Sequence, residues 1–241
     1  MTRRVLLGML TPSSNTALEP LTTAMLAGVP QATAHFGRFR VTEISLASHA
    51  LGQFDNRKII EAAELLADAK VGAIAWNGTS AGWLGLQADE RLCADITAAT
   101  KTPACTSTLA LREIMRSRGH KTLGLVTPYV DAIQERIAAH FGAEGMKVTA
   151  ERHLGISANW DFSEVSEAEL TRMVREVAAA KPDAITTFCT NLRAAHLVDR
   201  WEREFGIPVY DSISTAVWKA LRICGVDPRG IRGWGRLFEQ N

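Results

Sequence analysis

The sequence predicts an α/β protein built from two pseudo-symmetric lobes, each a parallel sheet flanked by helices, with a candidate active site in the cleft between them. Two observations lead to this prediction. Short apolar runs alternate along the chain with longer segments of helical periodicity, which is typical of parallel sheets covered by helices. In addition, the pattern of the first half recurs in the second half, which indicates a duplicated unit.

Buried strands are expected where the apolar runs are short and continuous, at residues 5–10, 73–76, 122–126 and 184–188. Between these runs, apolar residues recur at helical spacing and charged residues occupy the opposite face. The clearest helical segments are residues 57–69, 131–141 and 167–180.

The internal repeat consists of three matches in the same order. LGMLTP at residues 7–12 resembles LGLVTP 116 positions later, and AIAWNGT at residues 73–79 resembles AITTFCT 111 positions later. The third pair begins at Pro103 and Pro208, each followed by a Ser/Thr-rich turn and a helix. The repeat predicts lobes over residues 1–115 and 116–241, with the C-terminal segment packing back onto the first lobe. The alternative is a single doubly wound sheet in which the repeat is accidental.

Composition argues against several classes of partner. The 241 residues carry 27 Lys and Arg against 26 Asp and Glu without a basic run, so neither nucleic acid nor an anionic membrane is an expected partner. The first apolar run is too short for a signal peptide or a membrane span, which predicts a cytoplasmic protein. The four cysteines lack CxxC spacing and the six histidines are dispersed, so neither disulfides nor a metal site is expected. GxGxxG and Walker motifs are absent, so an enzyme that binds a dinucleotide or nucleotide cofactor is not expected.

Two loops of the predicted first lobe carry polar residues suited to an anion. Ser14 and Asn15 lie between the first strand and a predicted helix, where they can either bind a carboxylate or cap that helix. Gly78, Thr79 and Ser80 follow the strand at residues 73–76, where small residues let the backbone approach a ligand closely. Both loops lie at the carboxyl ends of strands, which is where open α/β sheets place ligands.

The equivalent loops of the second lobe add a phenol and a thiol. Tyr129 follows the strand at residues 122–126 and is either a donor to a developing oxyanion or a packed core aromatic. Cys189 and Thr190 follow the strand at residues 184–188. A thiol at the end of a strand and near a helix start is expected to have a lowered pKa, which favours Cys189 over the other three cysteines. The repeat places Cys189 opposite Gly78 across the cleft.

Together, the repeat, the Pro- and Ser-rich first loop, the Gly78 loop, Tyr129 and Cys189 resemble the aspartate/glutamate racemase superfamily. Within it, the resemblance is to the branch of arylmalonate decarboxylases and maleate cis-trans isomerases. It extends from the first strand to GWGRLF at residues 233–238. It implies the two-lobed fold and a cofactor-independent enzyme that acts on a small carboxylic acid.

The resemblance also implies a mechanism. Racemases and maleate isomerases of this superfamily use one cysteine from each lobe, whereas the first-lobe position here is Gly78, as in arylmalonate decarboxylase. Cys189 is then the only catalytic thiol. The implied reaction is decarboxylation of a substituted malonate or related dicarboxylic acid to an enediolate, which Cys189 protonates from one side. The implied donors to the enediolate are Thr79, Ser80, Tyr129, Thr190 and the backbone N–H groups of Cys189 and Thr190.

Two features depart from the decarboxylase pattern. The first loop looks more like that of maleate isomerases, in which the asparagine contacts a substrate carboxylate, so Asn15 is a candidate second anchor. Thr190 follows Cys189 where the decarboxylase has glycine. A maleate isomerase-like or amino-acid racemase-like isomerase is therefore an alternative, and so is a non-catalytic carboxylate-binding protein. The oligomeric state is open, with a homo-oligomer as one option.

The walls of the cleft are expected to come from residues 39–54 and 156–162. Trp83 and Trp160 are candidates for an apolar wall or for the core. Arg38, Arg40 and His49 are interpreted as a solvated face in preference to part of the site.

Overall fold

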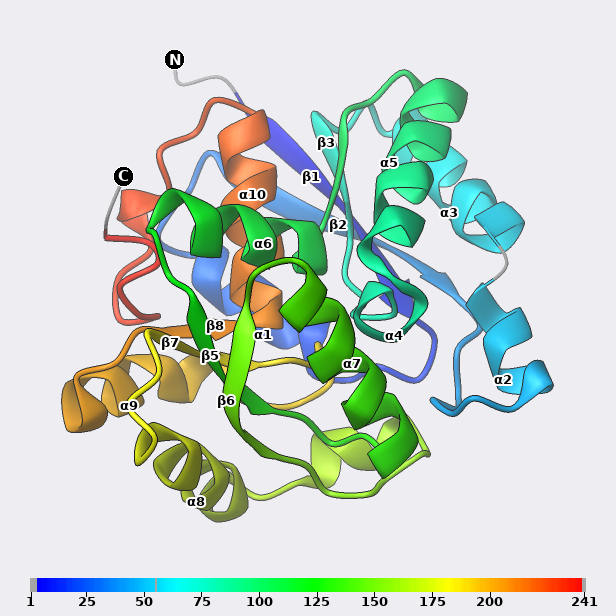
Figure 1. Ribbon diagram of the computed structural model, residues 1–241. Coiled ribbons are helices and arrows are strands. Elements are labelled where there is room, and N and C mark those ends of the chain that lie inside the picture. The colour runs from blue at the N-terminus through cyan, green and yellow to red at the C-terminus, as the bar shows by residue number, and fades with distance from the viewer. Residues whose placement is uncertain (1–3, 55, 240–241) are drawn as a thin grey trace.

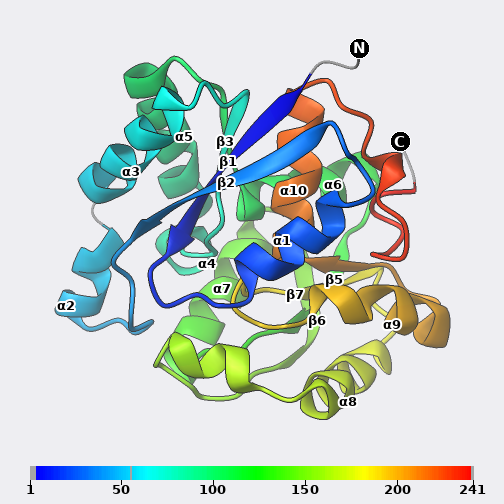
Figure 2. The same ribbon diagram turned by 180° about the vertical axis from the view of Figure 1, so that it is seen from behind.

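The computed structural model describes residues 4–54 and 56–239, and their strands form two separate sheets. The first sheet contains β1 (Val5–Pro12), β2 (Ala32–Phe39), β3 (Ala73–Trp76) and β4 (Ala104–Thr106). The second contains β5 (Thr122–Val126), β6 (Lys147–Arg152), β7 (Ala184–Thr187) and β8 (Val209–Asp211). Figures 1 and 2 show the sheets in separate halves of the molecule.

The strand order confirms the predicted duplication. The first sheet has the order β2-β1-β3-β4 and the second has the order β6-β5-β7-β8, so every strand has a counterpart in the other lobe. Neighbouring strands are parallel throughout both sheets. The two-lobed α/β fold is therefore confirmed, and the alternative of a single doubly wound sheet is wrong.

The apolar runs predict the four longer strands in which most residues are buried, β1, β3, β5 and β7. All four residues of β3 and of β7 are buried, and β3 and β5 begin and end at the predicted residues. The sequence does not reveal β2 and β6, because their side chains are largely half-buried or exposed at the sheet edges. Each of β4 and β8 has only three residues, too few for a periodic pattern.

The helices cover the two sheets. In the first half they are α1 (Leu18–Leu26), α2 (Ser48–Leu51), α3 (Asn56–Asp68), α4 (Ala81–Leu84), α5 (Leu86–Thr100) and α6 (Ser107–Ser117). In the second half they are α7 (Asp131–Ala143), α8 (Glu167–Ala178), α9 (Val198–Phe205) and α10 (Ser212–Ile223). Short 3-10 helices are η1 (Gly52–Phe54), η2 (Trp160–Glu164), η3 (Ala195–Leu197) and η4 (Pro228–Gly230). Helices α3, α7 and α8 confirm the three predicted helical segments.

The third match of the repeat corresponds to a shared strand-to-helix junction. Thr106, the last residue of β4, caps α6 because its hydroxyl accepts the backbone N–H of Leu109 at 3.0 Å. Asp211, the last residue of β8, caps α10 by accepting the backbone N–H groups of Ile213 and Ser214 at 2.8 and 3.3 Å. Each helix therefore begins directly where the strand ends.

Helix α10 belongs to the second half of the sequence but contacts β3 and β4 of the first sheet. It also packs along α6 and contacts α1 (Figure 1). The C-terminal segment approaches the first lobe closely, since a Cβ atom built on Gly230 would lie 2.6 Å from the carbonyl oxygen of Gly28. The last part of the chain therefore covers the first sheet.

One hydrophobic core runs through both lobes. Its fully buried members include Leu7 and Ile74 in the first sheet and Leu123 and Ile185 in the second. Burying a side chain of this size contributes about 1.5–3 kcal/mol to stability. Within residues 4–54 and 56–239, no helix combines the length and the apolar character needed to cross a membrane.

Candidate active site

A small cavity lies between the lobes, where loops at the carboxyl ends of β1, β3, β5 and β7 meet. Its volume is about 20 Å³, enough for one water molecule. The first lobe lines it with Pro12, Val41, Ile44, Trp76, Gly78, Thr79, Ser80 and Trp83. The second lobe lines it with Tyr129, Asn159, Cys189 and Thr190. Six of the residues singled out from the sequence thus meet at one site: Gly78, Thr79, Ser80, Tyr129, Cys189 and Thr190.

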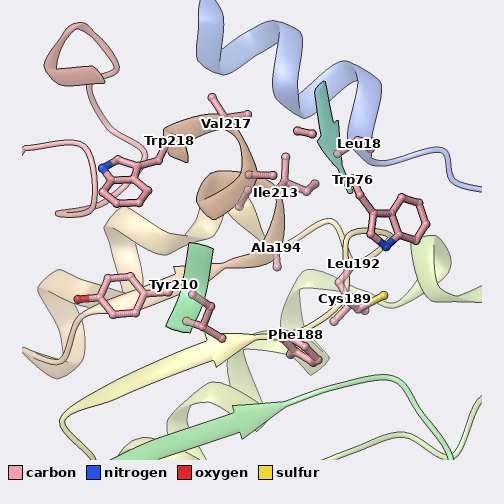
Figure 3. Packing of buried hydrophobic residues seen from close by; sticks show 14 of the residues in the cluster. Leu18, Trp76, Phe188, Cys189, Leu192, Ala194, Tyr210, Ile213, Val217 and Trp218 are labelled. Carbon is pink, nitrogen blue, oxygen red and sulfur yellow. The ribbon is translucent and has the colours of Figure 1, made fainter. Parts of the chain in front are cut away.

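Cys189 follows the end of β7, and its sulfur is turned toward Trp76 (Figure 3). Its side chain is 2% exposed, and the sulfur accepts the backbone N–H of Asn191 at 3.4 Å. Burial raises the pKa of Cys189 to about 11, although hydrogen bonds from Tyr129 and from backbone N–H groups act in the opposite direction. The lowered pKa expected from the sequence is therefore wrong, because loss of hydration outweighs the field of the N–H groups. At neutral pH the thiol carries its proton.

Tyr129 links the two lobes at the cavity. Its hydroxyl lies 2.6 Å from the hydroxyl of Thr79, and it also forms a hydrogen bond with Cys189. The ring is 2% exposed and packs edge-on against Trp83 and Phe162. Burial raises the pKa of Tyr129 well above its ordinary value, so the phenol stays protonated and can act as a hydrogen-bond donor. Tyr129 is therefore a packed aromatic, one of the two possibilities that the sequence offers, and its role as a donor to an oxyanion stays a prediction.

Backbone donors are available on both sides of the cavity. The N–H groups of Thr79 and Ser80 in the first lobe and of Thr190 in the second donate to no acceptor among the described residues. The N–H of Cys189, also expected to be a donor to substrate, is instead bonded to the carbonyl oxygen of Thr187 at 3.1 Å. Unpaired N–H groups beside a cavity suit a carboxylate or a developing oxyanion.

Asn15 joins the two lobes. Its amide nitrogen donates to the backbone oxygen of Thr190 at 3.1 Å and to the hydroxyl of that residue at 3.2 Å. Its amide oxygen accepts the N–H groups of Ala17 and Leu18 at 3.0 and 2.9 Å, which caps the start of α1. Asn15 is buried and is not among the cavity-lining residues. A role in carboxylate binding stays a prediction and would require some of these hydrogen bonds to break.

Asn159 is a site residue that the sequence does not single out. It lies within residues 156–162, and its amide nitrogen donates to the hydroxyl of Ser14 at 2.7 Å. The Ser14 hydroxyl donates in turn to the carbonyl oxygen of Val41 at 2.7 Å. Ser14 thus bonds protein groups of both lobes and does not line the cavity, and its expected anion-binding role stays a prediction. Asn159 carries no pattern in the sequence because it comes from an irregular loop between β6 and α8.

The remaining candidates are two tryptophans and three basic residues. Trp83 lines the cavity, whereas Trp160 is 53% exposed and lies outside its lining. Arg38 and His49 each pair with a glutamate at the surface and Arg40 is exposed, as the solvated-face interpretation requires. In the part of the chain that the structure describes, no group of three or more His, Cys, Asp or Glu side chains is placed to hold a metal ion.

The sequence is similar to those of two kinds of known enzyme. The family model described as arylmalonate decarboxylase matches residues 7–238. The chain is 28% identical to the arylmalonate decarboxylase of Bordetella bronchiseptica over 186 residues, which cover 76% of this chain and 78% of that protein. It is 26% identical to the maleate isomerase of Nocardia farcinica over 245 residues, which cover 98% of this chain and 96% of that protein.

Solved structures show the same similarity in three dimensions. A cysteine-to-serine mutant of the Nocardia farcinica maleate cis-trans isomerase, which carries a covalently bound succinylcysteine intermediate, is similar with a TM-score of 0.88. The two chains are 25% identical, and the match covers 98% of this chain and 99% of that one. The two-lobed architecture is therefore shared along essentially the whole length.

Proposed function

The chain belongs to the arylmalonate decarboxylase family, and from this premise we propose that it is a cofactor-independent decarboxylase of a substituted malonate or related small dicarboxylic acid. Cys189 would protonate the enediolate formed when carbon dioxide leaves. The observation that carries this proposal is a single thiol, protonated at neutral pH, in a cavity whose opposite side is a glycine.

A protonated thiol suits an acid better than a nucleophile. With a pKa of about 11, only a very small fraction of Cys189 is thiolate at pH 7, whereas almost all of it can donate a proton. A carbanion formed by loss of carbon dioxide needs one proton and no nucleophile. The state of Cys189 therefore favours decarboxylation over addition to a double bond.

The proposed reaction divides the site into an apolar part and a donor part. Val41, Ile44 and Trp83 supply an apolar wall, against which the departing carboxylate loses hydration. The carbon–carbon bond breaks, and its electron pair passes into the remaining carboxylate to form the enediolate. Tyr129 and the unpaired N–H groups hold the enediolate oxygens. The S–H proton of Cys189 then moves to the carbon, and the thiolate recovers a proton from water.

A dicarboxylic acid is much larger than the water molecule that the cavity now accommodates. Binding therefore requires the lining to move apart. Val41 of the first lobe and Asn159 of the second are joined through the Ser14 hydroxyl, so a movement between their segments would break these hydrogen bonds.

The test compares two cysteine variants in an assay of carbon dioxide release from a panel of aryl- and alkyl-substituted malonates. Cys189→Ala is expected to lower kcat by about 10²–10⁴-fold, which is the usual contribution of a positioned acid. Cys105→Ala is the matched control, because this thiol is also buried but lies outside the cavity. Decarboxylation by Cys189→Ala within a few-fold of the wild-type rate would rule out the proposed role.

The second candidate is a maleate isomerase-like reaction, favoured by the similarity to a maleate isomerase over nearly the entire chain. Incubation with maleate in deuterated water, followed by NMR, reports fumarate formation and α-proton exchange. Fumarate formation that Cys189→Ala abolishes would select this candidate over decarboxylation. Binding of a dicarboxylate that raises Tm without turnover of any substrate would point to a carboxylate-binding protein.

A further inference from the structure

Position 78 has no room for a side chain, and the reason is Trp76. A Cβ atom built on Gly78 would lie 1.9 Å from Cζ2, 2.2 Å from Cε2 and 2.5 Å from Cη2 of the Trp76 ring. Real Cβ atoms do not approach other heavy atoms this closely. The Gly78 loop is also fixed by a hydrogen bond, because the hydroxyl of Ser107 donates to the Gly78 carbonyl oxygen at 2.6 Å. The side chain at position 76 therefore determines whether position 78 can carry a side chain.

The equivalent positions of the second lobe carry different residues. The repeat aligns Trp76 with Thr187 and Gly78 with Cys189, each pair at the end of the corresponding strand β3 or β7. Thr187 is small, and its hydroxyl donates to the Asp211 carboxylate at 2.7 Å. The second lobe thus has a small side chain followed by a thiol, whereas the first has a large ring followed by a bare backbone.

The indole nitrogen of Trp76 has no partner among the described residues. Its N–H is buried, and the whole side chain is 1% exposed. Trp76 lines the same cavity as Cys189, and Figure 3 shows the nitrogen on the edge of the ring that is turned toward the Cys189 sulfur. Burying an N–H without an acceptor is unfavourable, so such a group at a cavity indicates an acceptor that a ligand supplies.

We propose that Trp76 takes the place of a first-lobe thiol: its ring keeps the Gly78 loop free of a side chain, and its N–H donates to a carboxylate oxygen of the substrate. An indole N–H is a donor that does not release its proton in this pH range. The first-lobe side of the substrate therefore has a hydrogen bond but no acid. Resting on the proposed function, this means that protonation comes from the Cys189 side alone and gives one enantiomer.

The donor role is tested with Trp76→Phe, which removes the N–H and keeps an aromatic ring. The probe is phenylmalonate, measured through its Kd by calorimetry in the Cys189→Ala background and through KM and kcat in the otherwise wild-type protein. Loss of a hydrogen bond to a charged group is expected to weaken binding roughly 10–100-fold. Trp201→Phe is the matched control, since Trp201 is equally buried but its N–H donates to the Thr171 hydroxyl at 3.1 Å. An unchanged Kd in Trp76→Phe would overturn the donor role.

The steric role is tested by a double-mutant cycle between positions 76 and 78. Gly78→Ala alone is expected to lower Tm by roughly 4–10 °C, because an extra carbon is forced against the ring. The same change in the Trp76→Leu background is expected to lower Tm much less. Gly142→Ala is the control, since a Cβ atom there meets open space. Equal effects of Gly78→Ala in both backgrounds would overturn the steric role.

Failure of the roles proposed for Trp76 can be distinguished from failure of the proposed function. The thermal cycle and the Kd measurement do not depend on which reaction the protein catalyses. If the wild-type protein releases no carbon dioxide from any malonate of the panel, the proposed function fails while these results stand. Where the function holds, Trp76→Leu combined with Gly78→Cys is expected to gain α-proton exchange in deuterated water, and Gly78→Cys alone is not, because only the double variant leaves space for a second thiol.

Discussion

The hydrogen bond between Thr79 and Tyr129 offers a quantitative test of the site geometry. The two hydroxyls lie 2.6 Å apart, come from opposite lobes and are both buried, at 4% and 2% exposure of their residues. Tyr129→Phe removes one hydroxyl and leaves the other without its partner. An orphaned buried hydroxyl costs about 1–3 kcal/mol, which corresponds to roughly 2–4 °C in Tm per kcal/mol for a chain of this size.

Thr79→Val removes one of the two partners of the Tyr129 hydroxyl, which keeps its hydrogen bond with Cys189, whereas the double variant removes both hydroxyls at once. The double variant should therefore be more stable than the sum of the single effects predicts, by about 1–2 kcal/mol. Urea unfolding of the four proteins at pH 7 gives the free energies of unfolding, and equal m-values verify that the comparison is valid.

A second measurement reports on the pKa of the Cys189 thiol. The hydrogen bond from Tyr129 lowers the pKa of Cys189, so Tyr129→Phe should raise that pKa and slow alkylation of Cys189 at pH 9. If Tyr129 donates to the enediolate as proposed, Tyr129→Phe should also lower kcat by about 10²–10³-fold. Single effects that add within about 0.5 kcal/mol, together with an unchanged alkylation rate, would refute the arrangement of Thr79, Tyr129 and Cys189 described here.

Three further predictions concern stability and pH. Asn15→Ala should lower the free energy of unfolding by about 2–4 kcal/mol in urea unfolding, because it removes a helix cap and the hydrogen bonds to Thr190, whereas a change confined to KM would show a substrate anchor instead. If Cys189 acts as an acid with a pKa of about 11, kcat should be flat through neutral pH and fall as the pH rises through 11, whereas a rate that increases up to pH 11 would indicate a thiolate nucleophile. Burial raises the pKa of Asp89 to about 7, so its contribution to stability is fully present below the unfolded-state pKa of about 3.9 and is lost as the pH rises through 7. Asp89→Asn should therefore stabilise the protein at pH 8 by up to about 4 kcal/mol and have little effect at pH 4, as measured by unfolding at both pH values with the exposed Asp95→Asn as control.

The sequence alone predicts the four longer strands in which most residues are buried. The residues of β3 and β7 are all buried, so a continuous apolar or small-residue run marks them, and the duplicated sequence around them predicts that Gly78 and Cys189 line one cavity. The edge strand β6 has no fully buried residue, and its mixed pattern reflects contacts with only one neighbouring strand.

The parts that sequence reasoning missed depend on three-dimensional neighbours. Asn159 reaches the cavity because its loop meets Ser14 of the other lobe, a contact between residues far apart in the chain. The pKa of Cys189 was expected to fall because the local N–H groups are visible in the sequence, but the burial that raises it comes from both lobes. In the sequence Trp76 is an ordinary strand residue, because only the structure shows that its ring packs against the Gly78 backbone.

The position of α10 has a consequence for how the protein is made. During translation, β1, β3 and β4 leave the ribosome long before the helix that contacts β3 and β4. At about 5–20 residues per second, the N-terminal half waits several seconds or longer with that apolar surface uncovered. Completion of the N-terminal half thus has to wait until α10 has left the ribosome, and a product truncated ahead of Ser212 would be a substrate for chaperones and proteases.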